Sequence, residues 1–173
     1  MLMISILVNT ETAAERVVKA TYEMPGHLAR RFQQIAVAVF LAEVEEAGYD
    51  LTPVQYVALA AVGENPGIDQ VGLAGLIAFD RTTIGGVVDR LVTKGVVTRQ
   101  ESSRDRRARE LTITAAGQRT LRGISPAVEA AQRTMLRGLT DREANELLRL
   151  LQKAIAAGNA LSRAPLHGAA AGT

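Results

Sequence analysis

The most constraining feature of the sequence is a run of apolar residues at positions 35–42 (IAVAVFLA), inside a helical pattern that extends from about residue 26 to residue 47. A helix that is apolar on every side must be covered on every side. One small domain usually covers one face of a surface helix, so the run predicts packing against its own domain and against a second chain. With 173 residues, the chain is long enough for one domain with helical extensions.

Capping residues and apolar periodicity divide the remaining chain into further elements. Thr52, Pro53 and Gln55 have the spacing of a capping box with proline at the first helical position. Further helices are expected after the N-cap candidates Asp69, Asp80 and Thr140. The helix after Asp80 has one apolar face, formed by Ile84, Val87, Val88, Leu91 and Val92. Two runs of β-forming residues, 96–99 and 110–114, predict a β-hairpin with a basic tip.

These patterns predict a mainly α fold with a small β-hairpin. The expected organisation is an N-terminal arm at 1–25, a helical dimerisation region at 26–48 and 115–163, a central module at 49–114 and a flexible tail at 164–173. The arm includes Met24, which is a second possible start of translation. The apolar stretch 1–8 is too short to span a bilayer and lacks the basic residues of a signal peptide, so we expect a cytoplasmic protein.

Charge is distributed unevenly along the chain. Between residues 81 and 109, eight basic residues stand against three acidic ones, which gives a net charge of +5. Because the whole chain carries +2, the remaining residues carry −3. A basic helix and hairpin on a slightly acidic body is the pattern expected of a module that binds duplex nucleic acid, although charge runs are more often simply solvated faces.

The helix after Asp80 makes the nucleic-acid interpretation more specific. Opposite its apolar stripe it presents short polar groups, one arginine and a central glycine: Thr82, Thr83, Gly86, Asp89, Arg90 and Thr93. A glycine in the middle of an exposed helix costs about 1 kcal/mol relative to alanine, which is reasonable if a DNA groove must approach the backbone there. The alternative is that Gly85 and Gly86 permit tight helix packing, which we favour for Gly85.

Several classes of function are disfavoured by composition. The chain has no cysteine, which excludes disulfides, thiolate metal ligands and cysteine oxidation. Its two histidines, His27 and His167, have no cluster of ligands around them, so no metal and no cofactor are expected. Without a nucleophile paired to a histidine or a phosphate-cradling glycine motif, an enzyme is not expected either. An architectural DNA-binding protein without a ligand switch, and a helical protein-interaction module, remain as alternatives.

An ordered set of motifs resembles the MarR-type winged helix-turn-helix transcriptional regulators, over roughly residues 26–161. The motifs are DQVGLA at 69–74, DRTTIGGVVDRL at 80–91, KGVVTR at 94–99, DRRA at 105–108 and LTITAAG at 111–117. The resemblance implies a homodimer held by N- and C-terminal helices, with two winged modules on pseudopalindromic operator DNA and repression as the default role.

The resemblance also implies which residues contact DNA. It assigns residues 80–94 to the recognition helix and residues 104–107 to the wing tip, which inserts an arginine into the minor groove. We favour Arg107 for the groove and Arg106 for a phosphate, although the order can be reversed, and Asp105 for orienting the neighbouring arginines. The complete candidate DNA-binding set is Arg81, Thr82, Thr83, Gly86, Asp89, Arg90, Lys94, Arg104, Asp105, Arg106 and Arg107.

Members of the family commonly bind small aromatic carboxylates or phenols, and this sequence is similar to members that control aromatic-acid catabolism. The similar residues form the candidate ligand-binding set: His27, Arg30, Arg31, Gln34, Gln55 and Tyr56. An arginine can pair with a carboxylate through two hydrogen bonds, and the other side chains can bond a ring substituent. Alternatively, Arg30 and Arg31 are solvated or pair across a dimer, and His27 is a capping residue.

Overall fold

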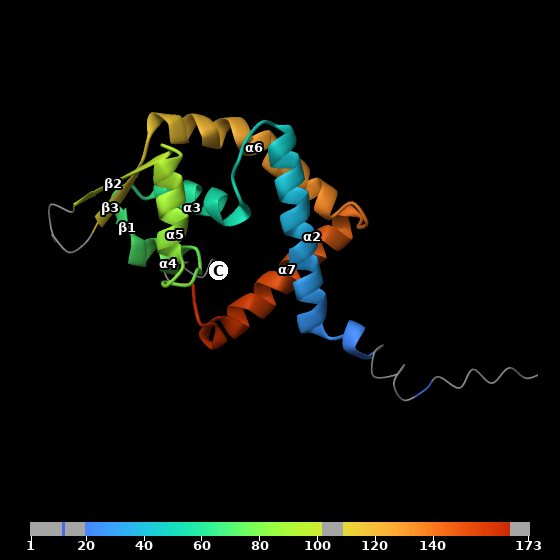
Figure 1. Ribbon diagram of the computed structural model, residues 1–173. Helices are drawn as coiled ribbons and strands as arrows, with labels where there is room; N and C mark the ends of the chain where they lie inside the picture. Colours follow the sequence, from blue (N-terminus) through green and yellow to red (C-terminus); the bar gives the residue numbers. More distant parts are fainter. Residues whose placement is uncertain (1–11, 13–19, 102–108, 167–173) are drawn as a thin grey trace, which may run out of the picture. The chain divides into compact units, whose positions relative to one another are not determined.

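The computed structural model describes residue 12 and residues 20–101 and 109–166 (Figure 1). These residues form a mainly helical fold with one small antiparallel sheet, so the predicted fold class is confirmed. The elements are α2 (Pro25–Glu46), α3 (Pro53–Glu64), β1 (Ile68–Asp69), α4 (Gln70–Leu76), α5 (Ile84–Thr93), β2 (Val97–Glu101), β3 (Arg109–Ile113), α6 (Ala115–Met135), α7 (Asp141–Gly158) and the 3-10 helix η1 (Asn159–Leu161). The chain divides into two compact units, Met1–Ala36 and Val37–Thr173.

Helices α3 and α7 begin, and α2 and α5 end, at residues that local chemistry predicts. Thr52 and Gln55 form the expected capping box at the start of α3, with both hydrogen bonds at 3.3 Å. Thr140 and Glu143 form a second box at the start of α7. Gly48 follows α2 with a φ of +79°, and Gly95 follows α5 with a φ of +71°. Only glycine adopts this left-handed conformation without a steric penalty, so both helices stop at positions the sequence specifies.

The sheet contains one strand more than the predicted hairpin. Its order is β1-β3-β2, and both pairings are antiparallel. The hairpin register runs from Val97 opposite Ile113 to Glu101 opposite Arg109. The additional strand, β1, pairs Ile68 with Leu111, and the two-residue strand is too short to show any alternation of apolar and polar side chains.

The core of the larger unit lies between α3, α4, α5, α6 and the sheet. Leu59 of α3, Leu73 of α4, Leu91 of α5, Leu111 of β3 and Ile124 of α6 are completely buried. The predicted apolar face of α5 is confirmed, because Ile84, Val87, Val88 and Leu91 are all buried and Val92 packs against them. Figure 1 shows α3, α4 and α5 beside the sheet, with α5 held by α3, α4 and β2.

The side chain of Thr114 joins the glycine turn that follows α5 to the first turn of α6. The Thr114 hydroxyl donates to the carbonyl of Gly95 at 2.8 Å and accepts from the N–H of Gly117 at 3.0 Å. Gly117 is buried, and a Cβ at this position would overlap the carbonyl oxygen of Val96. The close contact fixes the base of the hairpin against the first turn of the long helix α6.

The C-terminal helix α7 buries none of its side chains within the described chain. Three of its large apolar side chains share one face and are exposed: Leu148 to 47%, Leu151 to 37% and Ile155 to 66%. On α2, Phe40 is buried but its neighbour Leu41 is 40% exposed. The chain therefore covers only part of the apolar run that begins at residue 35. In the described part of the chain, no helix is both long enough and apolar enough to cross a membrane.

Candidate nucleic-acid interface

Two short helices, α4 and α5, form a helix-turn-helix on the surface of the larger unit. Asp69 caps α4, and its carboxylate accepts from the N–H of Gly72 at 2.6 Å. After α4 the chain reverses through Ala78, which has a φ of +50°. The N–H of Phe79 then donates to the carbonyl of Ala74 at 2.8 Å, which closes the turn that leads to α5.

The start of α5 differs from the sequence prediction. We expected the helix to follow Asp80 directly, whereas α5 begins at Ile84. The Asp80 carboxylate instead accepts two hydrogen bonds from Thr82, at 2.7 Å from its N–H and 2.6 Å from its hydroxyl. Thr82 and Thr83 consequently lie in a turn before α5 and not in its first helical turn. A carboxylate that bonds the chain two residues ahead competes with helix formation, and this local competition explains the difference.

Asp80 is well suited to remain ionised within this turn. Its pKa is lowered from the ordinary value mainly because the Thr82 hydroxyl donates to the carboxylate, followed by the Thr82 N–H, with a smaller effect from the positive charge of Arg163. Hydrogen bonds to the charged form of an acid lower its pKa in this way. The lowered pKa keeps the Asp80 carboxylate ionised, and able to accept these hydrogen bonds, further into the acidic pH range than an ordinary aspartate.

The outward face of α5 is exposed and carries the side chains that the sequence places there: Gly86, Asp89, Arg90 and Thr93. A Cβ added to Gly85 or Gly86 would meet no atom of another described segment within 4 Å. Neither glycine is therefore required for packing against the described residues, which contradicts the packing explanation that we favoured for Gly85. Gly86 leaves the backbone of α5 open to an approaching molecule.

Two of the cations beside this face have acidic partners. Arg99 of β2 bonds the carboxylate of Asp89 at 2.9 Å, and Lys94 forms an ion pair with Asp50. Both acidic side chains are well exposed, and exposed pairs of this kind contribute about 0–1 kcal/mol. The two cations can therefore exchange their carboxylates for DNA phosphates at little cost. Arg99 is absent from the predicted site, because the sequence indicates its charge but not its proximity to Asp89.

Arg81 and Arg90 form no ion pair with any other described residue, and both are exposed. Arg90 lies in the last turn of α5, and Arg81 lies in the turn before the helix. Unneutralised cations at both ends of an exposed helix face suit contacts with the phosphates on either side of a DNA groove.

The strands β2 and β3 form the base of the predicted wing. Their last described pair joins Glu101 to Arg109. The predicted wing-tip residues Arg104, Asp105, Arg106 and Arg107 lie outside the described residues.

Four of the predicted ligand-binding residues lie on the first turns of α2, within the smaller unit. Arg30 donates to the side-chain oxygen of Gln34 at 3.0 Å, and Arg31 is exposed. His27 packs against the edge of the Tyr22 ring, with 5.3 Å between ring centroids. Its Nε2 atom is buried and has no hydrogen-bond partner among the described residues.

The other two predicted ligand-binding residues lie on the first turn of α3. Gln55 is buried, and its side-chain oxygen is used in the capping box. Tyr56 is half-buried against Phe40 of α2, with 5.9 Å between their ring centroids. Gln55 therefore has a structural role in addition to any contact with a ligand. No group of three or more acidic or histidine side chains that could hold a metal occurs among the described residues.

A helix-turn-helix followed by a β-hairpin, with an exposed polar face on its second helix and the cations Arg81, Lys94 and Arg99 beside that helix, defines a winged helix-turn-helix DNA-binding protein. Residues 49–108 match the model of the MarR family. The chain is 32% identical over 132 residues to the putative transcriptional regulatory protein for the hcr operon of Thauera aromatica, an alignment that covers 75% of this chain and 80% of that protein. The protein belongs to the MarR family and is a DNA-binding transcriptional regulator.

Two similar solved structures concern DNA binding and its regulation by a small molecule. The transcriptional repressor CouR, bound to a 23-mer DNA duplex, is similar with a TM-score of 0.68 and 28% identity, covering 79% of this chain and 94% of that chain. BpsR of Bordetella bronchiseptica has a TM-score of 0.71 and 28% identity, covering 77% of this chain and 94% of that chain. The description of BpsR states that 6-hydroxynicotinic acid regulates its DNA binding.

Proposed function

We propose that this protein is a homodimeric repressor in the cytoplasm that binds a pseudopalindromic operator and is released by a small aromatic acid or phenol. It acts by binding and not as an enzyme. The observation that carries the DNA-binding part is the exposed face of α5 and the turn before it, where Gly86 leaves the backbone open and Arg81 and Arg90 have no ionic partner among the described residues. The similarity to CouR, a repressor bound to duplex DNA, supports the same part.

The homodimer is supported by apolar surface that one chain leaves uncovered. Leu148, Leu151 and Ile155 of α7 and Leu41 of α2 are exposed in the single chain. We assign dimerisation to residues 26–48 and 115–163 and DNA binding to residues 49–114. Two copies related by a two-fold axis would present two α5 helices to successive major grooves, which lie about 34 Å apart, and this symmetry matches a pseudopalindromic operator.

The effector class is supported by the chemistry of the first turns of α2. Arg30, with a planar cation, suits a carboxylate, and the imidazole of His27, whose Nε2 has no partner among the described residues, suits a ring hydroxyl or a second polar group. The regulation of BpsR by an aromatic carboxylic acid points to the same class. The effector favours a conformation in which the spacing of the two α5 helices no longer fits DNA. It can do so only by binding this conformation more tightly than the conformation that binds DNA.

The DNA-binding proposal is tested by Arg107→Ala. We expect weaker operator binding with an unchanged melting temperature, because the family resemblance assigns the wing-tip arginines to DNA contact. One lost phosphate contact reduces the slope of log affinity against log salt by about 1, whereas a lost minor-groove contact relaxes preference for A·T-rich sequence. Fluorescence anisotropy at several salt concentrations measures both effects, with Arg106→Ala run in parallel. Wild-type affinity and slope in both variants would contradict the wing assignment.

The effector proposal is tested by titrating 6-hydroxynicotinic acid, benzoate and hydroxybenzoates into the protein–operator complex. At least one compound should lower operator affinity by fivefold or more. A fivefold change corresponds to a coupling free energy of about 1 kcal/mol, which is the lower end of the usual range for allosteric effectors. Arg30→Gln should reduce this response without changing affinity for DNA in the absence of the compound. A complex insensitive to every aromatic acid and phenol would leave the DNA-binding role intact and favour an architectural protein without a ligand switch.

A further inference from the structure

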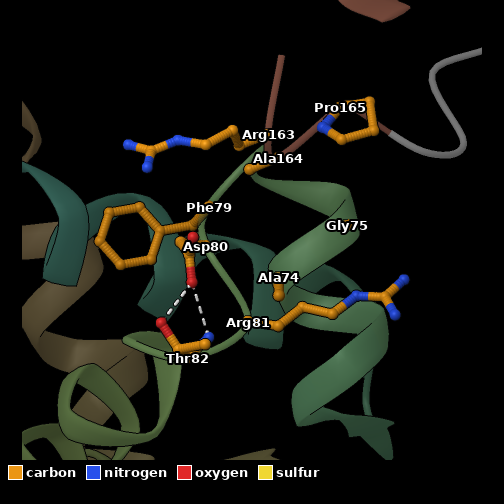
Figure 2. Close-up of a pocket in the computed structure, with 9 residues that line it drawn as sticks. All are labelled: Ala74, Gly75, Phe79, Asp80, Arg81, Thr82, Arg163, Ala164 and Pro165. Carbon is orange, nitrogen blue, oxygen red and sulfur yellow. Dashed lines mark hydrogen bonds between the residues drawn. The ribbon is translucent and has the colours of Figure 1, made fainter.

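A pocket of about 390 Å³ lies at the turn before α5, where the C-terminal segment meets the helix-turn-helix (Figure 2). One wall is formed by α4 and the turn, and the other by residues from beyond α7. The lining residues are Ala74, Gly75, Phe79, Asp80, Arg81, Thr82, Arg163, Ala164 and Pro165. Residues more than 80 positions apart in the sequence therefore share one surface at the entrance to the recognition helix.

The C-terminal wall of the pocket is held by defined hydrogen bonds. The Asn159 side chain accepts from the N–H of Leu166 at 2.8 Å and donates to the carbonyl of Leu166 at 3.3 Å. The N–H of Ala164 donates to the Ser162 hydroxyl at 3.1 Å. Ala164 and Pro165 are half-buried, whereas Arg163 is exposed. The start of the tail that we expected to be flexible thus forms a closed loop that presents one arginine.

Positive charge predominates around the pocket. Arg81 and Arg163 both line it, and neither forms an ion pair with any described residue. Among the described residues that line the pocket, only Asp80 has a carboxylate, and it already accepts two hydrogen bonds from Thr82. Figure 2 shows the guanidinium groups of Arg81 and Arg163 extending away from each other. This arrangement suits separate phosphates along a DNA strand better than one small anion held between two arginines.

We propose that Arg163 belongs to the DNA-binding surface and contacts a backbone phosphate next to the one reached by Arg81. The inference rests on the proposed DNA-binding function. It extends the DNA-binding surface beyond residues 49–114 to a segment that follows the last long helix. Because a phosphate contact carries no base information, Arg163 contributes to affinity and register and not to sequence preference.

The test compares Arg163→Ala with Arg137→Ala in the full-length protein. Arg137 is an exposed arginine in the turn before α7, at the opposite end of a helix of 18 residues, or about 27 Å. Both variants lose one charge, so a general effect of net charge would weaken both equally. For Arg163→Ala we expect the salt slope, which is the slope of log affinity against log salt concentration, to fall in magnitude by about 0.9. This change corresponds to roughly eightfold weaker binding at 0.1 M salt. The loss should be the same on operator and on random duplex DNA. Arg137→Ala should bind as the wild type does, and Arg163→Lys should restore most of the slope.

Each other outcome overturns the inference. A wild-type slope for Arg163→Ala, with or without a loss of affinity, would mean that the residue makes no phosphate contact. Equal weakening by Arg137→Ala would mean that only net charge matters. Arg90→Ala serves as a reference for the proposed function: if it lowers the slope while Arg163→Ala does not, DNA binding by α5 stands and only the C-terminal extension fails. If the wild-type protein shows no salt-dependent binding to duplex DNA, both proposals fail.

Discussion

Replacing Gly86 with leucine should abolish operator binding while the protein remains folded and dimeric. The position is exposed, and a Cβ there meets no atom of another described segment within 4 Å, so a larger side chain requires no rearrangement of the described residues. Leucine is also a better helix former than glycine by about 0.5–1 kcal/mol, so the melting temperature should be unchanged or higher. The new side chain projects into the space that DNA must occupy, and we expect affinity to fall by 100-fold or more.

Mobility-shift and thermal melting measurements on the same samples separate the two effects. Gly138→Leu is the matched control, because Gly138 is also exposed and lies in the turn between α6 and α7, away from α5 in the sequence. A Cβ added there would also meet no atom of another described segment within 4 Å. Gly86→Ala should have an intermediate affinity, since a methyl group occupies less of the approach. Normal operator binding by Gly86→Leu would show that DNA does not approach the backbone at this glycine.

The double change Leu148→Glu and Leu151→Glu should convert the dimer to a monomer. Both leucines are exposed in the single chain, on a helix that buries none of its own side chains. Burying a leucine side chain is worth about 1.5–3 kcal/mol, and two-fold symmetry places four of them in the interface. Four new carboxylates in that interface would remove this gain and add like-charge repulsion. Loss of the dimer should also lower operator affinity, because each monomer then binds its half-site independently.

Light scattering at micromolar concentration gives the oligomeric state directly. Lys153→Glu is the control, because it changes the net charge by the same −2 and lies on the opposite side of α7 at 100° per residue. This variant should remain a dimer. If the double glutamate variant is still a dimer, the contact between chains does not involve the apolar face of α7.

Local chemistry accounts for most of the secondary structure that was predicted. The capping boxes at Thr52 and Thr140 involve residues three positions apart, and the terminators Gly48 and Gly95 act through their own backbone angles. Interactions of this range are written in the sequence and need no knowledge of the fold. The same holds for the apolar stripe of α5, because helix periodicity alone places its members on one face.

Predictions failed where two local tendencies compete or where a partner lies far along the chain. Asp80 was expected to cap α5 directly, but its side chain bonds Thr82 and delays the helix to Ile84. The strand β1 exists only because β3 offers it a hydrogen-bonding edge, as in the bond of 2.9 Å from the N–H of Gly67 to the carbonyl of Leu111. Nothing in the two residues of β1 indicates that partner.

The sequence by itself determined the existence of the helices, most of their ends, the uneven distribution of charge and the family motifs of the winged helix-turn-helix. Only the tertiary structure decided which charges are neutralised and which surfaces they share. It pairs Asp89 with Arg99, leaves Arg90 without an ionic partner among the described residues, and brings Arg163 beside Asp80. Caps and periodicity depend on neighbours within one or two helical turns, whereas these pairings depend on how distant segments pack, which no local pattern specifies.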